Sequence, residues 1–133
     1  MATVRKAVTI SQPADLVWDA VSDAGQLHTR VAPGVVANCT WDEEGEVRFV
    51  TFGNGLMLRE LMISNDPSTR RLAWSAHSDL WQHHNASLQI FALEDGSCEA
   101  VWTADVLPHA AGELMEQFLT MGLDAMKSHL EAV

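Results

Sequence analysis

The sequence is poor in basic residues, in cysteine and in long apolar runs, and it has no tyrosine at all. Its 133 residues include only 8 lysines and arginines against 18 aspartates and glutamates, a net charge of -10. Binding to phosphate groups depends on clustered cations, so we expect no nucleic-acid partner and no anionic membrane surface. No apolar stretch is long enough to cross a bilayer, so no membrane span is expected.

The two cysteines, Cys39 and Cys98, lie in separate strand-like segments and form neither a CxxC pair nor a disulfide framework. Free, buried thiols suit a reducing compartment, and the first residues lead into a strand pattern without a signal peptide. The sequence therefore predicts a cytoplasmic protein. Neither cysteine has an identifiable histidine partner, so a thiol nucleophile is not expected.

The length and an apolar fraction of 47% fit one domain that spans residues 1–133. Alternation predicts a first strand over residues 4–10. Helical spacing of apolar residues then predicts a short helix capped by Ser11 or Gln12. Asp23 is expected to cap a second short helix through about residue 28.

From residue 35 the period of the apolar residues changes to two, which is typical of strands. Turn sequences divide this region into six further strands, at about 36–41, 46–52, 56–64, 70–77, 84–93 and 98–106. Strands that follow one another through tight turns form an antiparallel meander. After Pro108 the helical period returns and predicts one long helix over Gly112–Leu130. The apolar stripe of this helix must be buried, and the concave face of the sheet is the available surface. A helix packed on an antiparallel sheet in this way belongs to the α+β fold class.

Five short motifs, in this order, resemble those of the Bet v 1/START-like superfamily, also called SRPBCC. They are SQPADLVW at Ser11–Trp18, GEVR at Gly45–Arg48, REL at Arg59–Leu61 with Asp66, LAWS at Leu72–Ser75, and CEAVW at Cys98–Trp102. The superfamily includes polyketide cyclase/dehydrase-like proteins and plant abscisic acid receptors. The resemblance covers nearly the whole chain. It implies a helix-grip fold: a seven-stranded curved antiparallel sheet around the long C-terminal helix, two short helices after the first strand, and a cavity in between. The first strand is then expected to pair with the last.

Alternation along each strand places several large and polar side chains on common faces, and the resemblance implies that these faces line the cavity. The candidate ligand-binding residues are Arg48, Phe52, Leu58, Glu60, Trp74, His84, Leu88, Trp102, Phe118 and Gly122. The two tryptophans offer flat walls for an aromatic or polycyclic ligand, or they simply fill the core. Gly122 is expected to leave empty space on the inward face of the long helix.

The polar candidates allow several interpretations. A buried Glu60 carboxylate is costly without a partner, and Arg48 is a possible one. Such a pair is either a structural ion pair at the rim of the sheet, an anchor for the polar end of a ligand, or an acid–base element. His84 is a candidate hydrogen-bonding residue of the pocket that titrates near neutral pH, or an ordinary packed histidine. His83 and His84 point to opposite faces, so a metal site with His77 is not expected. No cofactor is expected either.

Three functions fit these features. The first is a carrier or binding protein for a small hydrophobic ligand, such as an aromatic or polyketide-like molecule. The second is an enzyme of the polyketide cyclase/aromatase or dehydratase kind, in which His84, Glu60 or Arg48 moves a proton or polarises a carbonyl. The third is a module that regulates a partner protein. A homodimer is also considered.

Overall fold

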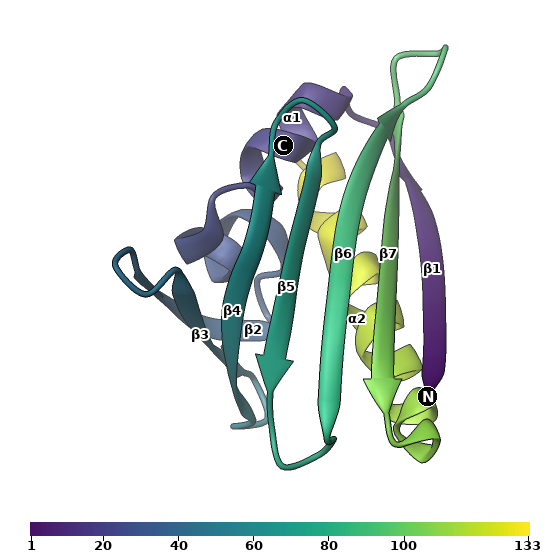
Figure 1. Cartoon of the computed structure of the whole chain (residues 1–133). Coiled ribbons are helices and arrows are strands. Elements are labelled where there is room, and N and C mark those ends of the chain that lie inside the picture. Colours follow the sequence, from purple (N-terminus) through teal and green to yellow (C-terminus); the bar gives the residue numbers. More distant parts are fainter.

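A computed structural model describes all residues from 1 to 133, and in it a seven-stranded antiparallel sheet curves around a long C-terminal helix (Figure 1). The strands are β1 (Ala2–Ile10), β2 (Val36–Asp42), β3 (Val47–Phe52), β4 (Met57–Asp66), β5 (Arg71–His77), β6 (His83–Ala92) and β7 (Cys98–Leu107). Their order in the sheet is β1-β7-β6-β5-β4-β3-β2, so the first strand pairs with the last. The predicted helix-grip fold is confirmed.

The short helices after β1 differ from the prediction. Helix α1 (Ala14–Val21) begins after Pro13, and no side chain caps it. Ser11 and Gln12, the expected caps, instead form hydrogen bonds with residues near the C-terminus. The Ser11 backbone N–H donates to the Glu131 carboxylate at 2.8 Å, and the Gln12 amide donates to the Leu130 carbonyl at 3.0 Å.

The second predicted helix is a 3₁₀ turn, η1 (Ala24–Gln26), followed by a π-helical turn, η2 (Leu27–Val31). Asp23 caps neither turn with its side chain. Its carboxylate accepts a hydrogen bond from the Arg30 guanidinium at 3.1 Å. This exposed ion pair links η2 to the residue before η1, and Val31 of η2 is buried.

A further 3₁₀ turn, η3 (His109–Ala111), leads into helix α2 (Gly112–Glu131). Its buried residues recur at helical spacing: Met115, Leu119, Leu123, Met126 and Leu130. This stripe packs on the concave face of the sheet and contacts β1 and β7. None of the helices is long and apolar enough to cross a membrane.

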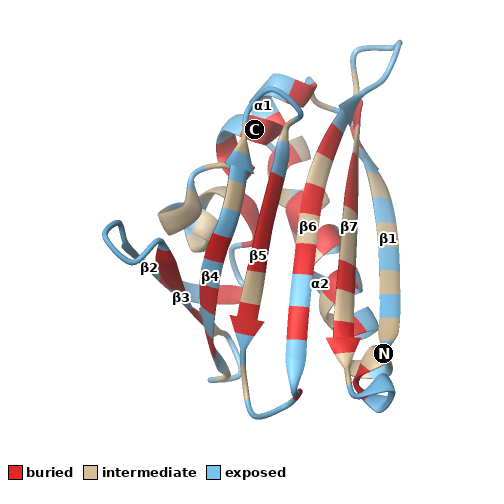
Figure 2. Ribbon diagram, viewed as in Figure 1, coloured by how far each residue is buried: buried red, intermediate tan, exposed pale blue.

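Buried and exposed residues alternate along β4 and β6, as expected for a sheet with one covered face (Figure 2). The largest fully buried side chains, Ile10, Leu72, Ile90, Leu119 and Met126, come from both the sheet and α2. Burying each such side chain stabilises the folded state by about 1.5–3 kcal/mol relative to leaving it exposed. The sheet and the helix thus share one core, which holds the cavity walls in place.

Candidate functional site

A cavity of about 480 Å³ lies between the concave face of the sheet and α2, which is a usual size for a small-molecule site. Nineteen of its 27 lining residues are hydrophobic. The exposed members of the lining mark its opening: Gly34 before β2, Gly53 and Asn54 on the β3–β4 turn, and Gln117 and Met121 on α2. The interior of this cavity is therefore mostly apolar, and its mouth lies between that turn and the helix.

All ten residues predicted from the sequence lie on the wall of this one cavity. They are Arg48, Phe52, Leu58, Glu60, Trp74, His84, Leu88, Trp102, Phe118 and Gly122. Alternation along β3 to β7 places the strand residues on the inner face, and helical spacing places the last two there on α2. That these residues bind a ligand stays a prediction.

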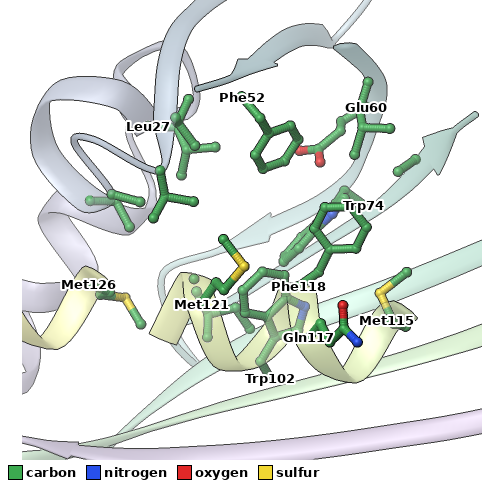
Figure 3. Close-up of a pocket in the computed structure, with 18 of the residues that line it drawn as sticks. Leu27, Phe52, Glu60, Trp74, Trp102, Met115, Gln117, Phe118, Met121 and Met126 are labelled. Carbon is green, nitrogen blue, oxygen red and sulfur yellow. The ribbon is translucent and has the colours of Figure 1, made fainter. Parts of the chain in front are cut away.

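Aromatic rings form two sides of the cavity (Figure 3). The rings of Trp74 and Trp102 have their centroids 5.7 Å apart, in a tilted arrangement. Phe118 on α2 contacts Phe52 of β3 at a centroid distance of 5.6 Å and meets the Trp81 ring edge-on at 6.2 Å. Rings at these distances and tilted or edge-on angles attract each other, so the aromatic wall is firmly packed.

Gly122 does not leave the empty space that was predicted. A Cβ atom at this position would lie only 2.6 Å from the Cζ3 atom of Trp102. The missing side chain therefore gives room to the indole ring, which packs directly on the backbone of α2. A larger residue such as leucine would therefore displace the Trp102 ring. Had the space beside Gly122 been empty, as predicted, the leucine side chain would have filled it.

The cavity wall contains a buried ion pair. Arg48 Nε donates to Glu60 Oε1 at 2.7 Å, and the two residues are only 3% and 6% exposed. They lie directly opposite each other on β3 and β4. The guanidinium also lies 5.5 Å from the centre of the Trp74 ring, and its Nη1 donates to the Ala24 carbonyl at 3.5 Å. The question left open by the sequence is thus answered: the two side chains pair, in the interior and not at a rim.

The Glu60 carboxylate points into the space between Phe52 and Trp74 (Figure 3). Only one of its oxygens bonds to Arg48, so Oε2 retains its capacity to accept a hydrogen bond. A polar group of a ligand can use that capacity without separating the ion pair.

His84, on β6, is fixed by a backbone contact. The Ala76 N–H of β5 donates to its Nδ1 at 2.9 Å, so the proton of the neutral ring lies on Nε2. The ring stacks on Trp81 at a centroid distance of 5.4 Å. Burial, with a smaller contribution from His83, lowers the pKa of His84 to about 4. The expectation that it titrates near neutral pH is wrong, because the sheet and Trp81 exclude the water that would stabilise a charged ring.

This pKa predicts a pH dependence of stability. In the unfolded chain His84 binds a proton near pH 6.5, whereas in the folded protein it does so only near pH 4. The contribution of the neutral ring is therefore complete above pH 6.5 and is lost as the pH falls toward 4. The expected loss in the free energy of unfolding is about 3 kcal/mol, measured by urea denaturation across this range.

A His84→Asn variant should show a flatter pH profile, whereas His83→Asn, at the neighbouring exposed position, should keep the steep one. The carboxyls of Asp66, Asp95 and Glu131 have lowered pKa values because they accept hydrogen bonds, so their effects fall at more acidic pH. An unchanged slope between pH 6.5 and 5 in His84→Asn would contradict the assignment.

Several residues that line the cavity were not predicted from the sequence. Trp81 lies between two strands, in a segment without periodicity, and its indole N–H donates to the Ala76 carbonyl at 2.9 Å. Leu27 and Val31 line the cavity from the irregular turn η2. Met115 and Met126 belong to the helix stripe that was identified only as core. Chemical type alone gave no signal here, since only the folded position distinguishes a cavity wall from ordinary packing.

Other reactive side chains offer no second site. His77 and His83 are exposed and lie apart from the cavity lining. No group of three or more His, Cys, Asp or Glu side chains is arranged to hold a metal ion. Cys39 and Cys98 are free and buried, and burial raises the pKa of both thiols, which disfavours the nucleophilic thiolate.

Comparison with known proteins gives a family and a fold. A family model described as polyketide cyclase / dehydrase and lipid transport matches residues 1–131. No curated protein matches the sequence. A solved protein from Thermobifida fusca is 29% identical, with a TM-score of 0.80 over 99% of this chain and 95% of that one.

Two further solved structures share the fold. The protein XoxI from Bacillus cereus has a TM-score of 0.86 at 16% identity, over 99% of this chain and 98% of that one. The Zhui aromatase/cyclase from Streptomyces sp. R1128 has a TM-score of 0.81 at 21% identity, over 98% of this chain and 93% of that one. At these identities the likeness concerns the fold alone.

Proposed function

This chain belongs to the polyketide cyclase/dehydrase and lipid transport family, and from that premise we propose that it is a carrier or binding protein for a small, largely apolar molecule. The observation that supports this most strongly is the cavity of about 480 Å³ with a mostly hydrophobic wall. The packed rings of Trp74, Trp102 and Phe118 favour an aromatic or polycyclic ligand, because flat faces bury the most apolar surface against one another.

The polar groups on the wall favour binding over proton transfer. His84 is neutral and its Nδ1 is already occupied, so the ring lacks a free basic nitrogen. The Arg48 and Glu60 side chains neutralise each other. Groups of this kind orient a ligand through hydrogen bonds. A general base also needs an uncommitted lone pair within reach of the proton, and among these groups only Glu60 Oε2 retains one.

An enzyme of the cyclase/aromatase or dehydratase kind is the second candidate. It is favoured by the Arg48 guanidinium, a charged group on the wall of an apolar cavity that can stabilise negative charge on a carbonyl oxygen. The two candidates differ in the fate of the ligand. Mass spectrometry of a ligand recovered after incubation should return it unchanged for a carrier and converted for an enzyme.

Binding itself is tested with N-phenyl-1-naphthylamine, an uncharged probe whose fluorescence rises in apolar surroundings. The wild-type protein should bind it at one site. Leu58→Trp should abolish that binding, because Leu58 is 5% exposed on the cavity wall and a larger side chain occupies the probe's space. Fluorescence titration measures both.

Leu61→Trp is the matched control, with the same substitution on the same strand. Leu61 lies on the outer face of the sheet and is 37% exposed, so this variant should bind the probe like wild type. Equal binding by Leu58→Trp and wild type would mean that the probe occupies some other surface. Absence of binding by wild type would reject the proposed function for aromatic ligands of this size.

A further inference from the structure

Four inward-facing residues form a row across the sheet. Arg48 of β3 lies opposite Glu60 of β4, and Glu60 lies opposite Ala76 of β5. The Ala76 N–H then bonds to the imidazole of His84 on β6, which extends the row by one strand. All four residues line the cavity.

The middle of this row carries its smallest side chain, Ala76, and the Trp81 indole beside it donates to the Ala76 carbonyl at 2.9 Å. Ala76 contributes only a methyl group, between the Glu60 carboxylate on one side and the His84 ring on the other. Neighbouring strands are about 4.8 Å apart, so the backbones of Glu60 and His84 are roughly 10 Å apart across β5. Because Ala76 itself lines the cavity, a small gap lies over its methyl group, bounded by a polar side chain on each side and by the Trp81 indole.

The two boundaries offer opposite hydrogen-bonding capacities. Glu60 Oε2 is an acceptor, because Arg48 uses only Oε1. His84 Nε2 is a donor, because the backbone contact at Nδ1 places the ring proton there. A hydroxyl group is the simplest function that donates and accepts at once.

The charges on the wall exclude ionic ligands. Arg48 and Glu60 cancel, and the imidazole of His84 is uncharged at neutral pH. An ionised group placed over Ala76 would lose its hydration without gaining a counter-ion of its own, which is strongly unfavourable. The site therefore discriminates against carboxylates and ammonium groups.

We propose that the ligand is an uncharged aromatic molecule whose hydroxyl group lies over Ala76, where it donates to Glu60 Oε2 and accepts from His84 Nε2. This assignment rests on the proposed function, since it describes the polar end of a ligand held in the same cavity. The aromatic body lies against the tryptophan walls, and the hydroxyl sets its orientation and its selectivity.

Three naphthalene probes test the assignment by calorimetric or fluorescence titration at pH 7. 2-Naphthol carries the hydroxyl, which stays protonated because phenolic pKa values lie near 10. Naphthalene lacks it, and 2-naphthoate is an anion of similar size. 2-Naphthol should bind roughly ten- to a hundredfold more tightly than naphthalene, from two hydrogen bonds. 2-Naphthoate should bind more weakly than 2-naphthol.

Two variants locate the contact. In His84→Asn the amide oxygen keeps an acceptor for the Ala76 N–H, but no donor reaches the position of Nε2. This variant should lose about tenfold in 2-naphthol affinity, with little change for naphthalene. Ala76→Val fills the gap and should also remove the preference. His83→Asn, at the adjacent exposed position, is the matched control and should retain it.

Each outcome is decisive. If wild type binds 2-naphthol and naphthalene equally, or if both His84→Asn and Ala76→Val keep the preference, the hydroxyl assignment is overturned while the cavity remains a binding site. Tightest binding of 2-naphthoate would overturn the charge argument. If no probe binds at all, this assignment falls together with the proposed function.

Discussion

Replacing Arg48 by methionine should lower the free energy of unfolding by about 3–5 kcal/mol, because it leaves the Glu60 carboxylate buried without its partner. Glu60 is only 6% exposed, and Arg48 is the side chain that bonds to it. Loss of the guanidinium contact with the Trp74 ring adds to the effect. Urea denaturation followed by circular dichroism measures the change.

The double variant Arg48→Met/Glu60→Met is the control. With both charges replaced by apolar side chains of similar length, most of the stability should return, because neither group then needs a partner in the interior. Such a recovery would indicate that the pair is not required for folding, which supports a role at the ligand. A single variant that loses less than about 1 kcal/mol would show that water reaches the carboxylate, and would contradict a buried pair.

The second large effect concerns two leucines on α2. Leu119→Ala should cost about 2–5 kcal/mol, because Leu119 is 0% exposed and well packed in the core. Leu114→Ala should cost less, about 1 kcal/mol, because Leu114 is half-buried and lines the cavity, where fewer contacts are lost. Thermal and urea unfolding of both variants compare the two sides of one helix.

The comparison is also sensitive to the cavity. If Leu114→Ala and Leu119→Ala cost the same, the space beside Leu114 is filled in solution and the helix is packed uniformly. If Leu114→Ala costs little and also raises the affinity for bulky probes, the residue borders an open cavity.

The regular elements could be predicted because their signals are local. Strict alternation in β4 and β6, and the helical stripe of α2, depend only on which side chains face the core. The same alternation placed Arg48 and Glu60 on one inner face. Their pairing followed from the register of β3 and β4, which tight turns set.

Features that depend on distant contacts could not be read in this way. Asp23 is a residue type that often caps helices, but its carboxylate accepts a hydrogen bond from Arg30 instead. Gly122 was predicted to leave empty space, because nothing in the local sequence reveals that Trp102 of β7 packs there. The low pKa of His84 arises from burial against Trp81 and β5, which the spacing of histidines does not encode.

A crystal structure of the protein with N-phenyl-1-naphthylamine bound tests most directly whether the cavity is a ligand site. The expected result is one probe molecule between the concave face of the sheet and α2, in contact with Trp74 and Phe118, with the cavity otherwise as described. A structure in which side chains fill this space and the probe lies on the outer surface, or is absent at saturating concentration, would contradict the proposed function.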